Sequence, residues 1–169
     1  MQLLPIHADG STAADVRSAG ESGVETLAQT LALYGRQGFH PPWIGYLAME
    51  DGRCVGACGF AGPPRDGEVE IAYFTFPEHE GKGVASRMAA GLIALTRAAA
   101  LGSGVRFIAH TLPEENPSTR ILKRLGFERV GEIQHPEDGL IWKWREPGLP
   151  AVVCGIGMGT QTPPDKRKT

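Results

Sequence analysis

The sequence predicts one α/β (α+β) domain with a central mixed, mostly antiparallel sheet of about six to seven strands and helices on both faces. The first supporting observation is the order of the expected elements: a helix, a hairpin, a strand, a helix, a strand, a helix and a final hairpin. Hairpins join antiparallel strands, whereas a helix between two strands makes them parallel. The other two observations are a glycine-rich strand-to-helix junction at residues 74–86 and a change of composition after residue 146.

Length and charge exclude several classes of protein. The chain has 169 residues, an apolar share of 41% and a net charge of −2. This length suffices for one hydrophobic core. The charge does not predict binding to nucleic acid or to an anionic membrane. No uninterrupted apolar run approaches the ~20 residues that a spanning helix needs, and residues 1–10 lack the pattern of a secretory signal.

The cysteines predict a reducing compartment. The chain has three, an odd number, and they form no CxxC pair. Cys54 and Cys58 lie four residues apart in an expected strand, so they are predicted to be small buried side chains on one face. We therefore expect a cytoplasmic location.

The first half of the chain reads as a helix followed by a hairpin. Residues 11–37 are expected to be helical, because apolar residues recur there at helical spacing. Strands are expected over residues 43–50 and 53–60. Between them, Asp51-Gly52 is a strong signal for a two-residue turn.

The third expected strand, residues 68–76, alternates in character. Its period of two places one set of side chains on each face of the sheet. One face carries two carboxylates beside apolar and aromatic neighbours, so this strand is either half exposed or lines a site. The two sets are Val69, Ile71 and Tyr73 on one face, and Glu68, Glu70, Ala72 and Phe74 on the other.

The second half begins with a helix over residues 81–101. Its inner face is predicted from a period near 3.6 and consists of Val84, Met88, Leu92, Leu95 and Ala99. A strand at 105–110, a helix at 118–125 and strands at 127–133 and 140–145 follow.

The domain is expected to cover residues 1–146. Residues 147–169 form a Pro/Gly-rich tail, which we predict to be partly disordered or to pack on a sheet edge or a partner. Residues 151–158 are apolar enough to add a strand to a partner subunit, so a homodimer is among the expected states.

The junction at residues 74–86 is predicted to bind an anion. A strand that turns on glycines into a helix leaves several backbone N–H groups without intrahelical partners, and the helix dipole adds positive potential there. A Walker loop does not fit, because Phe76 stands five residues before Gly81 where glycine is required. The glycines also lack the GxGxxG spacing. The glycines by themselves agree equally well with an anion site and with a tight turn that binds no ligand.

A second segment adds an identity to this junction. Asn116-Pro117-Ser118 through Leu125-Gly126-Phe127 follows after one helix and one strand. Together with Glu70-Ile71-Ala72-Tyr73 and the stretch from Pro77 to Ala85, it resembles the GCN5-related N-acetyltransferase (GNAT) superfamily. The asparagine-proline-serine version is most similar to the branch that includes ribosomal-protein N-terminal acetyltransferases. The matching segments cover residues 68–127, and the order of the flanking strands extends the implied GNAT fold over most of the chain.

The resemblance implies acetyl-CoA as the co-substrate and no metal. The junction looks like the family's pyrophosphate loop, Q/R-x-x-G-x-G/A, whose backbone N–H groups hold the cofactor. The second segment would contact the pantetheine arm, with helix capping as the alternative role of its polar residues. The set expected to bind the cofactor is Phe74, Thr75, Phe76, Glu80, Gly81, Lys82, Gly83, Val84, Ala85, Ser86, Asn116, Ser118 and Arg120.

Acetyl transfer to an amine sets three chemical requirements. The amine must lose a proton, and a carboxylate can take it directly or through water. The oxyanion needs an N–H donor, which a strand backbone can supply. The departing thiolate benefits from a hydroxyl. Glu70 or Glu68 is the expected base, with a solvent-facing strand residue as the alternative, and Ser118 is the expected thiolate donor.

Two positions depart from the family pattern. Glu80 stands where the family usually has Gln or Arg, and Lys123 stands where many members have a tyrosine as general acid. The main expectation is an acetyl-CoA-dependent N-acetyltransferase acting on a primary amine, either a small molecule or a protein N-terminus, by direct transfer in a ternary complex. The alternatives are a catalytically weak acyl-CoA-binding or sensor module, and an interaction protein that binds no CoA.

Overall fold

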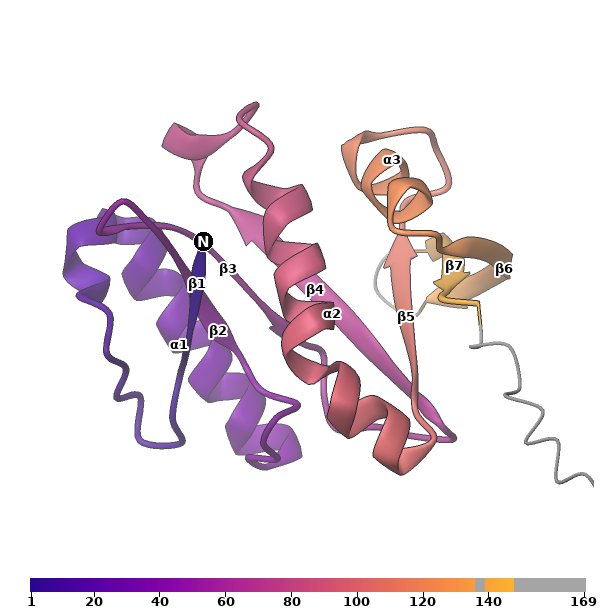
Figure 1. Cartoon of the computed structure of the whole chain (residues 1–169), viewed down its shortest axis with the longest axis horizontal. Helices are drawn as coiled ribbons and strands as arrows, with labels where there is room; N and C mark the ends of the chain where they lie inside the picture. Colours follow the sequence, from indigo (N-terminus) through magenta and orange to yellow (C-terminus); the bar gives the residue numbers. More distant parts are fainter. Residues whose placement is uncertain (136–138, 148–169) are drawn as a thin grey trace, which may run out of the picture.

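The structure, a computed structural model, describes residues 1–135 and 139–147, except for the side chains of residues 17 and 18. Most of the tail predicted from residue 147 onward therefore lies outside the described residues. Within them, one seven-stranded sheet forms the centre of the molecule (Figure 1). Its strand order is β1-β2-β3-β4-β5-β7-β6. The strands are β1 (Gln2–Pro5), β2 (Tyr46–Glu50), β3 (Arg53–Phe60), β4 (Glu68–Thr75), β5 (Arg106–Thr111), β6 (Glu128–His135) and β7 (Gly139–Arg145).

The sheet is mixed and mostly antiparallel, as the sequence predicts. Only β4 and β5 pair in parallel, and the long helix between them makes that crossover. Every other neighbouring pair is antiparallel. The fold class is therefore confirmed.

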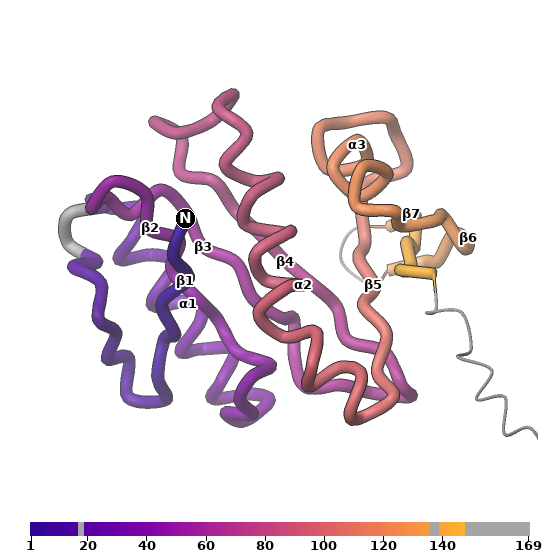
Figure 2. The backbone as a smooth tube through the Cα atoms, viewed as in Figure 1, coloured from indigo at the N-terminus to yellow at the C-terminus, as the bar shows by residue number. Residues whose placement is uncertain are grey.

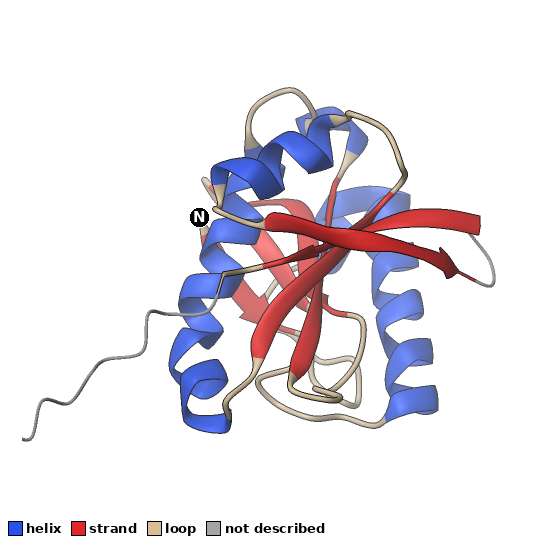
Figure 3. Ribbon diagram, turned by 90° about the vertical axis from the view of Figure 1, so that its right-hand side faces the viewer, coloured by secondary structure: helices blue, strands red, loops and turns tan. Residues whose placement is uncertain are grey.

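Helices cover both faces of the sheet (Figure 3). The three helices are α1 (Gly20–Gln37), α2 (Val84–Ser103) and α3 (Pro117–Arg124), with short 3-10 turns η1 (Val16–Ala19) and η2 (Pro77–His79). Buried residues of α2 pack with one hydrophobic cluster, whereas Leu27 of α1 packs against a second cluster that contains Leu47 and Ala57. The sheet therefore separates an α2 face from an α1 face.

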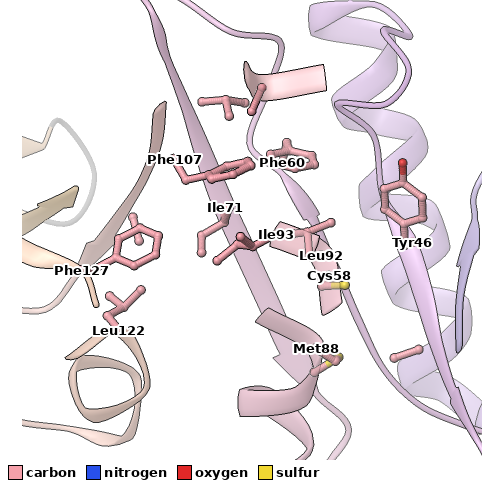
Figure 4. Packing of buried hydrophobic residues seen from close by; sticks show 14 of the residues in the cluster. Tyr46, Cys58, Phe60, Ile71, Met88, Leu92, Ile93, Phe107, Leu122 and Phe127 are labelled. Atoms are coloured by element: carbon pink, nitrogen blue, oxygen red, sulfur yellow. The ribbon is translucent and has the colours of Figure 1, made fainter. Parts of the chain in front are cut away.

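Figure 4 shows the larger cluster, on the α2 side. Phe60 and Phe107 stack with their ring centroids 6.3 Å apart, and both are buried. Leu92 lies beneath them and is fully buried, while Ile71 of β4 is 3% exposed. This packing joins β3, β4 and β5 to α2, and so fixes the end of the sheet where β4 and β5 lie together.

Two features of the N-terminal end differ from the prediction. The first helix begins at Gly20 and not at residue 11, because the chain first forms the turn η1, and Gly20 enters α1 with a φ of +63°. β1 was not expected, and it pairs with β2 at the sheet edge. It has only four residues and includes Pro5, which is too short for a period of two to be recognised.

A β-bulge overturns the expectation for the two cysteines. The register of β2 with β3 shifts between Ala48 and Met49, and a bulge inserts one extra residue into one strand. Cys54 consequently packs in the α1-side cluster and Cys58 in the α2-side cluster. The burial of both thiols was predicted and is confirmed.

The inner face of α2 also differs from the prediction in the second half of the helix, where Ala99 is only partly buried. Leu92 is fully buried, but Leu95 is 54% exposed. The buried face continues instead through Thr96 and Ala100. An 18-residue window of α2 has a mean hydropathy of 1.3, so by length and composition the helix suits a membrane span. Its packing on β3 and β4 accounts for that composition.

We predict that Leu92→Ala destabilises the protein by about 2–5 kcal/mol, because it removes buried contacts and leaves a cavity. The free energy of unfolding in urea measures this change. Leu95→Ala is the matched control and should change stability by less than about 0.5 kcal/mol. Equal losses for the two variants would contradict the assigned face of α2.

Candidate functional site

The candidate site lies where β4 and β5 separate. The two strands pair over only three positions, the last being Glu70 with Ile108. Beyond that point each strand stays bonded to its other neighbour: Thr75 of β4 pairs with Gly56, and Thr111 of β5 pairs with Trp142. The smooth trace shows the two strands diverging toward α3 (Figure 2). We call the space between them the gap.

Backbone groups of β4 face the gap. The Phe76 N–H donates to the Val55 carbonyl at 3.1 Å, and the Glu70 carbonyl accepts from the Ala61 N–H at 3.0 Å. Because alternate residues of an antiparallel strand bond to the same neighbour, the residues between them direct their N–H and C=O groups away from β3. Tyr73 and Thr75 therefore present backbone groups to the gap.

The helix α2, which follows β4, begins without a side-chain cap. Gly81 and Gly83 have φ values of +71° and +73°, the left-handed conformation that glycine adopts without strain. Gly83 is the N-cap of α2, and no side chain bonds to the N–H groups of the first turn. The free donors of Val84, Ala85 and Ser86 thus form a positive end that suits an anion.

Arg87 holds this turn in place. Its guanidinium forms a two-pronged ion pair with Glu50 of β2, at 2.6 Å and 2.8 Å. It also donates to the Lys82 carbonyl at 3.0 Å. A Cβ added at residue 83 would lie 3.2 Å from the same guanidinium. A side chain at residue 83 would therefore require the Arg87 guanidinium to shift by a few tenths of an ångström.

A pocket of about 550 Å³ lies between this turn and α3. Most residues of the expected cofactor set line it. It is open on one side, with the start of α2 on one wall and α3 on the other. The lining residues are Tyr73, Phe74, Thr75, His79, Glu80, Gly81, Gly83, Val84, Ala85, Ser86, Pro117, Ser118, Arg120, Ile121 and Arg124. We call it the cofactor pocket.

Three residues of the expected set lie outside this lining. Phe76 is 1% exposed in the α1-side core. The Lys82 ammonium donates to the Glu78 carbonyl at 2.8 Å. The Asn116 side chain accepts from the Thr119 N–H at 3.0 Å, and the Thr119 hydroxyl accepts from the Asn116 N–H in return. Helix capping thus accounts for Asn116, and its contact with the cofactor stays a prediction.

The charges and polar atoms of the pocket fit an anionic ligand. Arg120 and Arg124 lie four residues apart on α3, and both line the pocket. The Thr75 hydroxyl is buried and has no hydrogen-bond partner among the described residues, so a ligand in the gap would satisfy it. Glu80 is exposed and is the acidic side chain of this lining. The residues present therefore fit a group such as the phosphates and arm of CoA.

Tyr73 and Ser118 connect the two walls of the pocket. Burial raises the pKa of Tyr73 above its ordinary value, although a hydrogen bond with the Ser118 side chain lowers it in part. The tyrosine hydroxyl therefore keeps its proton at neutral pH. Ser118 was expected to donate to the departing thiolate, and that role stays a prediction; the structure places Tyr73 in the same pocket lining, beside Ser118.

The two candidate bases have different surroundings. Partial burial raises the pKa of Glu68, but hydrogen bonds from Lys143 and Arg145 outweigh it and hold that pKa below its ordinary value. Glu70 is bound less tightly: its carboxylate lies 2.9 Å from His110 Nδ1, and a third of its side chain is exposed. This difference favours Glu70 as the proton acceptor, and the assignment stays a prediction.

Sequence reasoning did not identify His110 or Arg124. His110 lies on β5 two residues beyond the last pair with β4, so its approach to Glu70 depends on the strand register. Its Nε2 atom is buried without a partner among the described residues. Arg124 had a sequence signal, since it follows Arg120 by one helical turn and therefore shares its face.

A second pocket, of about 310 Å³, lies between α1 and the sheet. Its lining shares Tyr73 and Phe74 with the cofactor pocket. The two pockets therefore meet at β4. The other lining residues are Ile6, Thr26, Gln29, Thr30, Leu33, Arg36, Gly45, Tyr46, Ala57, Cys58, Gly59, Phe60 and Ala72.

Across residues 1–135 and 139–147, no group of three or more His, Cys, Asp and Glu side chains is placed to hold a metal ion.

Comparisons with known proteins agree with this geometry. Residues 11–128 match the acetyltransferase (GNAT) domain family. No curated protein sequence matches the chain significantly. A ribosomal L7/L12 α-N-protein acetyltransferase, RimL, in complex with CoA is 16% identical, with a TM-score of 0.56 over 75% of this chain and 71% of that one.

Two further solved structures are similar in fold. The microcin C7 self-immunity acetyltransferase MccE, in complex with acetyl-CoA and AMP, is 15% identical, with a TM-score of 0.57 over 73% of this chain and 69% of that chain. A chimera of spermidine N-acetyltransferase SpeG, from Vibrio cholerae and hSSAT, is 14% identical, with a TM-score of 0.61 over 86% of this chain and 95% of that chain. At identities of 14–16%, these similarities show that the chain shares the fold of the three proteins.

We predict that Glu68→Gln lowers the free energy of unfolding by about 1–3 kcal/mol at pH 7, because Lys143 and Arg145 lose a charged acceptor. Since the folded pKa of Glu68 is lowered, its contribution is present above the unfolded value of about 4.3 and is lost as pH falls through the folded value. Urea unfolding at several pH values should show the loss shrinking below about pH 4.

The exposed Glu114 provides the control for this measurement. Glu114→Gln should leave stability nearly unchanged at every pH. A Glu68→Gln loss that stays constant down to pH 2 would contradict the assigned ion pairs.

Proposed function

Since the chain belongs to the GNAT acetyltransferase domain family, and is thus an acetyl-CoA-dependent acetyltransferase, we propose that it transfers the acetyl group to a primary amine directly, in a ternary complex. The acceptor is a small molecule or a protein N-terminus. We also propose a cytoplasmic location, which the free thiols of Cys54 and Cys58 support.

One observation carries the proposal of direct transfer. The cofactor pocket and the α1-side pocket meet at Tyr73 and Phe74, where β4 has left β5. A donor bound on one side of β4 and an acceptor bound on the other can therefore meet without an enzyme-bound acyl group. We call the α1-side pocket the acceptor pocket from here on.

Bound acetyl-CoA supplies a thioester-activated acetyl group. The first turn of α2, from Gly83 to Ser86, would hold its pyrophosphate through backbone N–H groups. Arg120 and Arg124 add positive charge on the opposite wall. The Thr75 hydroxyl and the backbone groups of β4 would bind the arm along the gap.

Glu70 is suited to take the proton from the acceptor amine. Its side chain lies on the α1 face of β4, two residues from Ala72 of the acceptor pocket. The contact with His110 Nδ1 holds the carboxylate in one orientation. The partial exposure of Glu70 also admits a water molecule that can relay the proton.

Donors for the two developing negative charges lie in the gap. The Tyr73 N–H faces the space beside Glu70 and can bind the oxyanion. The Ser118 side chain lies within hydrogen-bonding reach of the Tyr73 hydroxyl, and a hydroxyl of this pair can donate to the leaving sulfur. Tyr73 thus fills the role for which Lys123 is unsuited.

The direct test is release of free thiol from acetyl-CoA over a panel of amines and N-terminal peptides. Turnover with at least one primary amine is expected. Tight binding of acetyl-CoA with no turnover on any acceptor would contradict the proposal and favour a binding module.

We predict that Gly83→Asp weakens the binding of CoA roughly tenfold or more, because it places a carboxylate among the free N–H groups of α2. Isothermal titration calorimetry measures the Kd. Gly83→Asn is the matched control, since asparagine has the same size and also adopts positive φ. Equal effects of Asp and Asn would argue against an anion at this helix terminus.

We predict that Glu70→Gln lowers kcat by roughly a hundredfold or more, the usual contribution of a general base, with little change in the Kd of acetyl-CoA. Thiol release at saturating acetyl-CoA measures kcat. Glu68→Gln, corrected for its folded fraction, should retain most of the activity. A fully active Glu70→Gln variant beside an inactive Glu68→Gln variant would reverse the two roles.

A further inference from the structure

The chemistry of the acceptor pocket indicates which amines it takes, an inference that rests on the proposed function. The floor of the pocket is apolar. Phe74 is 52% exposed and Ala72 beside it is also exposed, which is unusual for a strand covered by a helix. Leu33 of α1 lines the opposite wall. An apolar part of a ligand would cover this surface and gain the free energy of its burial.

The charge of the pocket is positive. Arg36, in the last turn of α1, is the only ionised side chain among the residues that line it. It is exposed and forms no ion pair with any described residue. Burial raises the pKa of Tyr46 and of Cys58 to about 12, so both lining groups are neutral at physiological pH.

The remaining polar residues of the pocket are neutral. Thr26, Gln29 and Thr30 contribute hydroxyl and amide groups from α1. The Gln29 amide donates to Glu25, a side chain outside the lining, at 3.1 Å. The lining therefore offers no carboxylate to a second ammonium group. Glu70 lies outside this lining, on the same face of β4 and two residues before Ala72.

We propose that the acceptor is a small primary amine with an apolar body and an anionic group, such as a carboxylate. Its amine is held at the gap beside Glu70, its apolar body covers Phe74, and its anionic group pairs with Arg36. A volume of about 310 Å³ suits a small molecule. A diamine or polyamine would place its second ammonium group against the guanidinium with no carboxylate to neutralise it.

The test uses amines that are matched in length and differ at one end. The full chain is assayed for thiol release with acetyl-CoA and 6-aminohexanoate, hexylamine or 1,6-diaminohexane. Phenylalanine and phenethylamine form a second matched pair. Spermidine and a ten-residue peptide complete the panel. We expect the carboxylate-bearing amine of each matched set to have a KM about two- to fivefold below its neutral counterpart, as for an exposed ion pair, and the diamine to be the poorest.

Variants of Arg36 separate recognition of the anion from folding and catalysis. Arg36→Ala should bring the KM for 6-aminohexanoate close to that for hexylamine, so that the preference for the carboxylate is lost, and Arg36→Lys should restore part of the preference. Arg53→Ala, which removes an exposed arginine of the β2–β3 hairpin, should behave like the wild type.

Three outcomes would overturn the inference and leave acetyl transfer intact: a lower KM for spermidine or the diamine, an unchanged preference in Arg36→Ala, or turnover of the peptide with none of the small amines. Failure of acetyl-CoA to bind, measured separately by calorimetry, would instead contradict the proposed function itself.

Discussion

The separation of β4 from β5 is the constraint on which the site depends. The two strands share three paired positions and then follow their outer neighbours, β3 and β7. This leaves the backbone groups of Tyr73 and Thr75 without strand partners, at a point where a ligand can satisfy them. If β4 and β5 were paired along their full length, the gap would be closed. The cofactor pocket and the acceptor pocket would then no longer meet.

The core and one ion pair hold the two sides of the gap. The stacked Phe60 and Phe107 rings join β3 to β5 on the α2 side of the sheet. At the open end, Arg87 ties the start of α2 to Glu50 of β2 and thereby fixes the turn that presents its N–H groups. The end of the site that we propose to bind phosphate is therefore part of the same framework as the sheet.

Pattern in the sequence predicted the elements well, and the contacts between them less well. The alternation of β4 placed Glu70 on its correct face, and the glycines at residues 81 and 83 predicted the turn that leads into α2. Contact between Glu70 and His110 needs the register of two strands, which no single pattern contains. Phe76 was included in the cofactor set because it adjoins the turn. The alternation of β4 continues past Thr75, so Phe76 lies on the same face as Phe74 and is buried there.

The most direct test of the account is a thermal-shift titration of the full chain with acetyl-CoA. A ligand that binds only the folded state stabilises it by about 2.7 kcal/mol at one hundred times its Kd, which corresponds to a rise in Tm of roughly 5–10 °C for a domain of this size. We expect a rise in Tm that increases with the concentration of acetyl-CoA and is smaller in Gly83→Asp. An unchanged Tm at millimolar acetyl-CoA would contradict it.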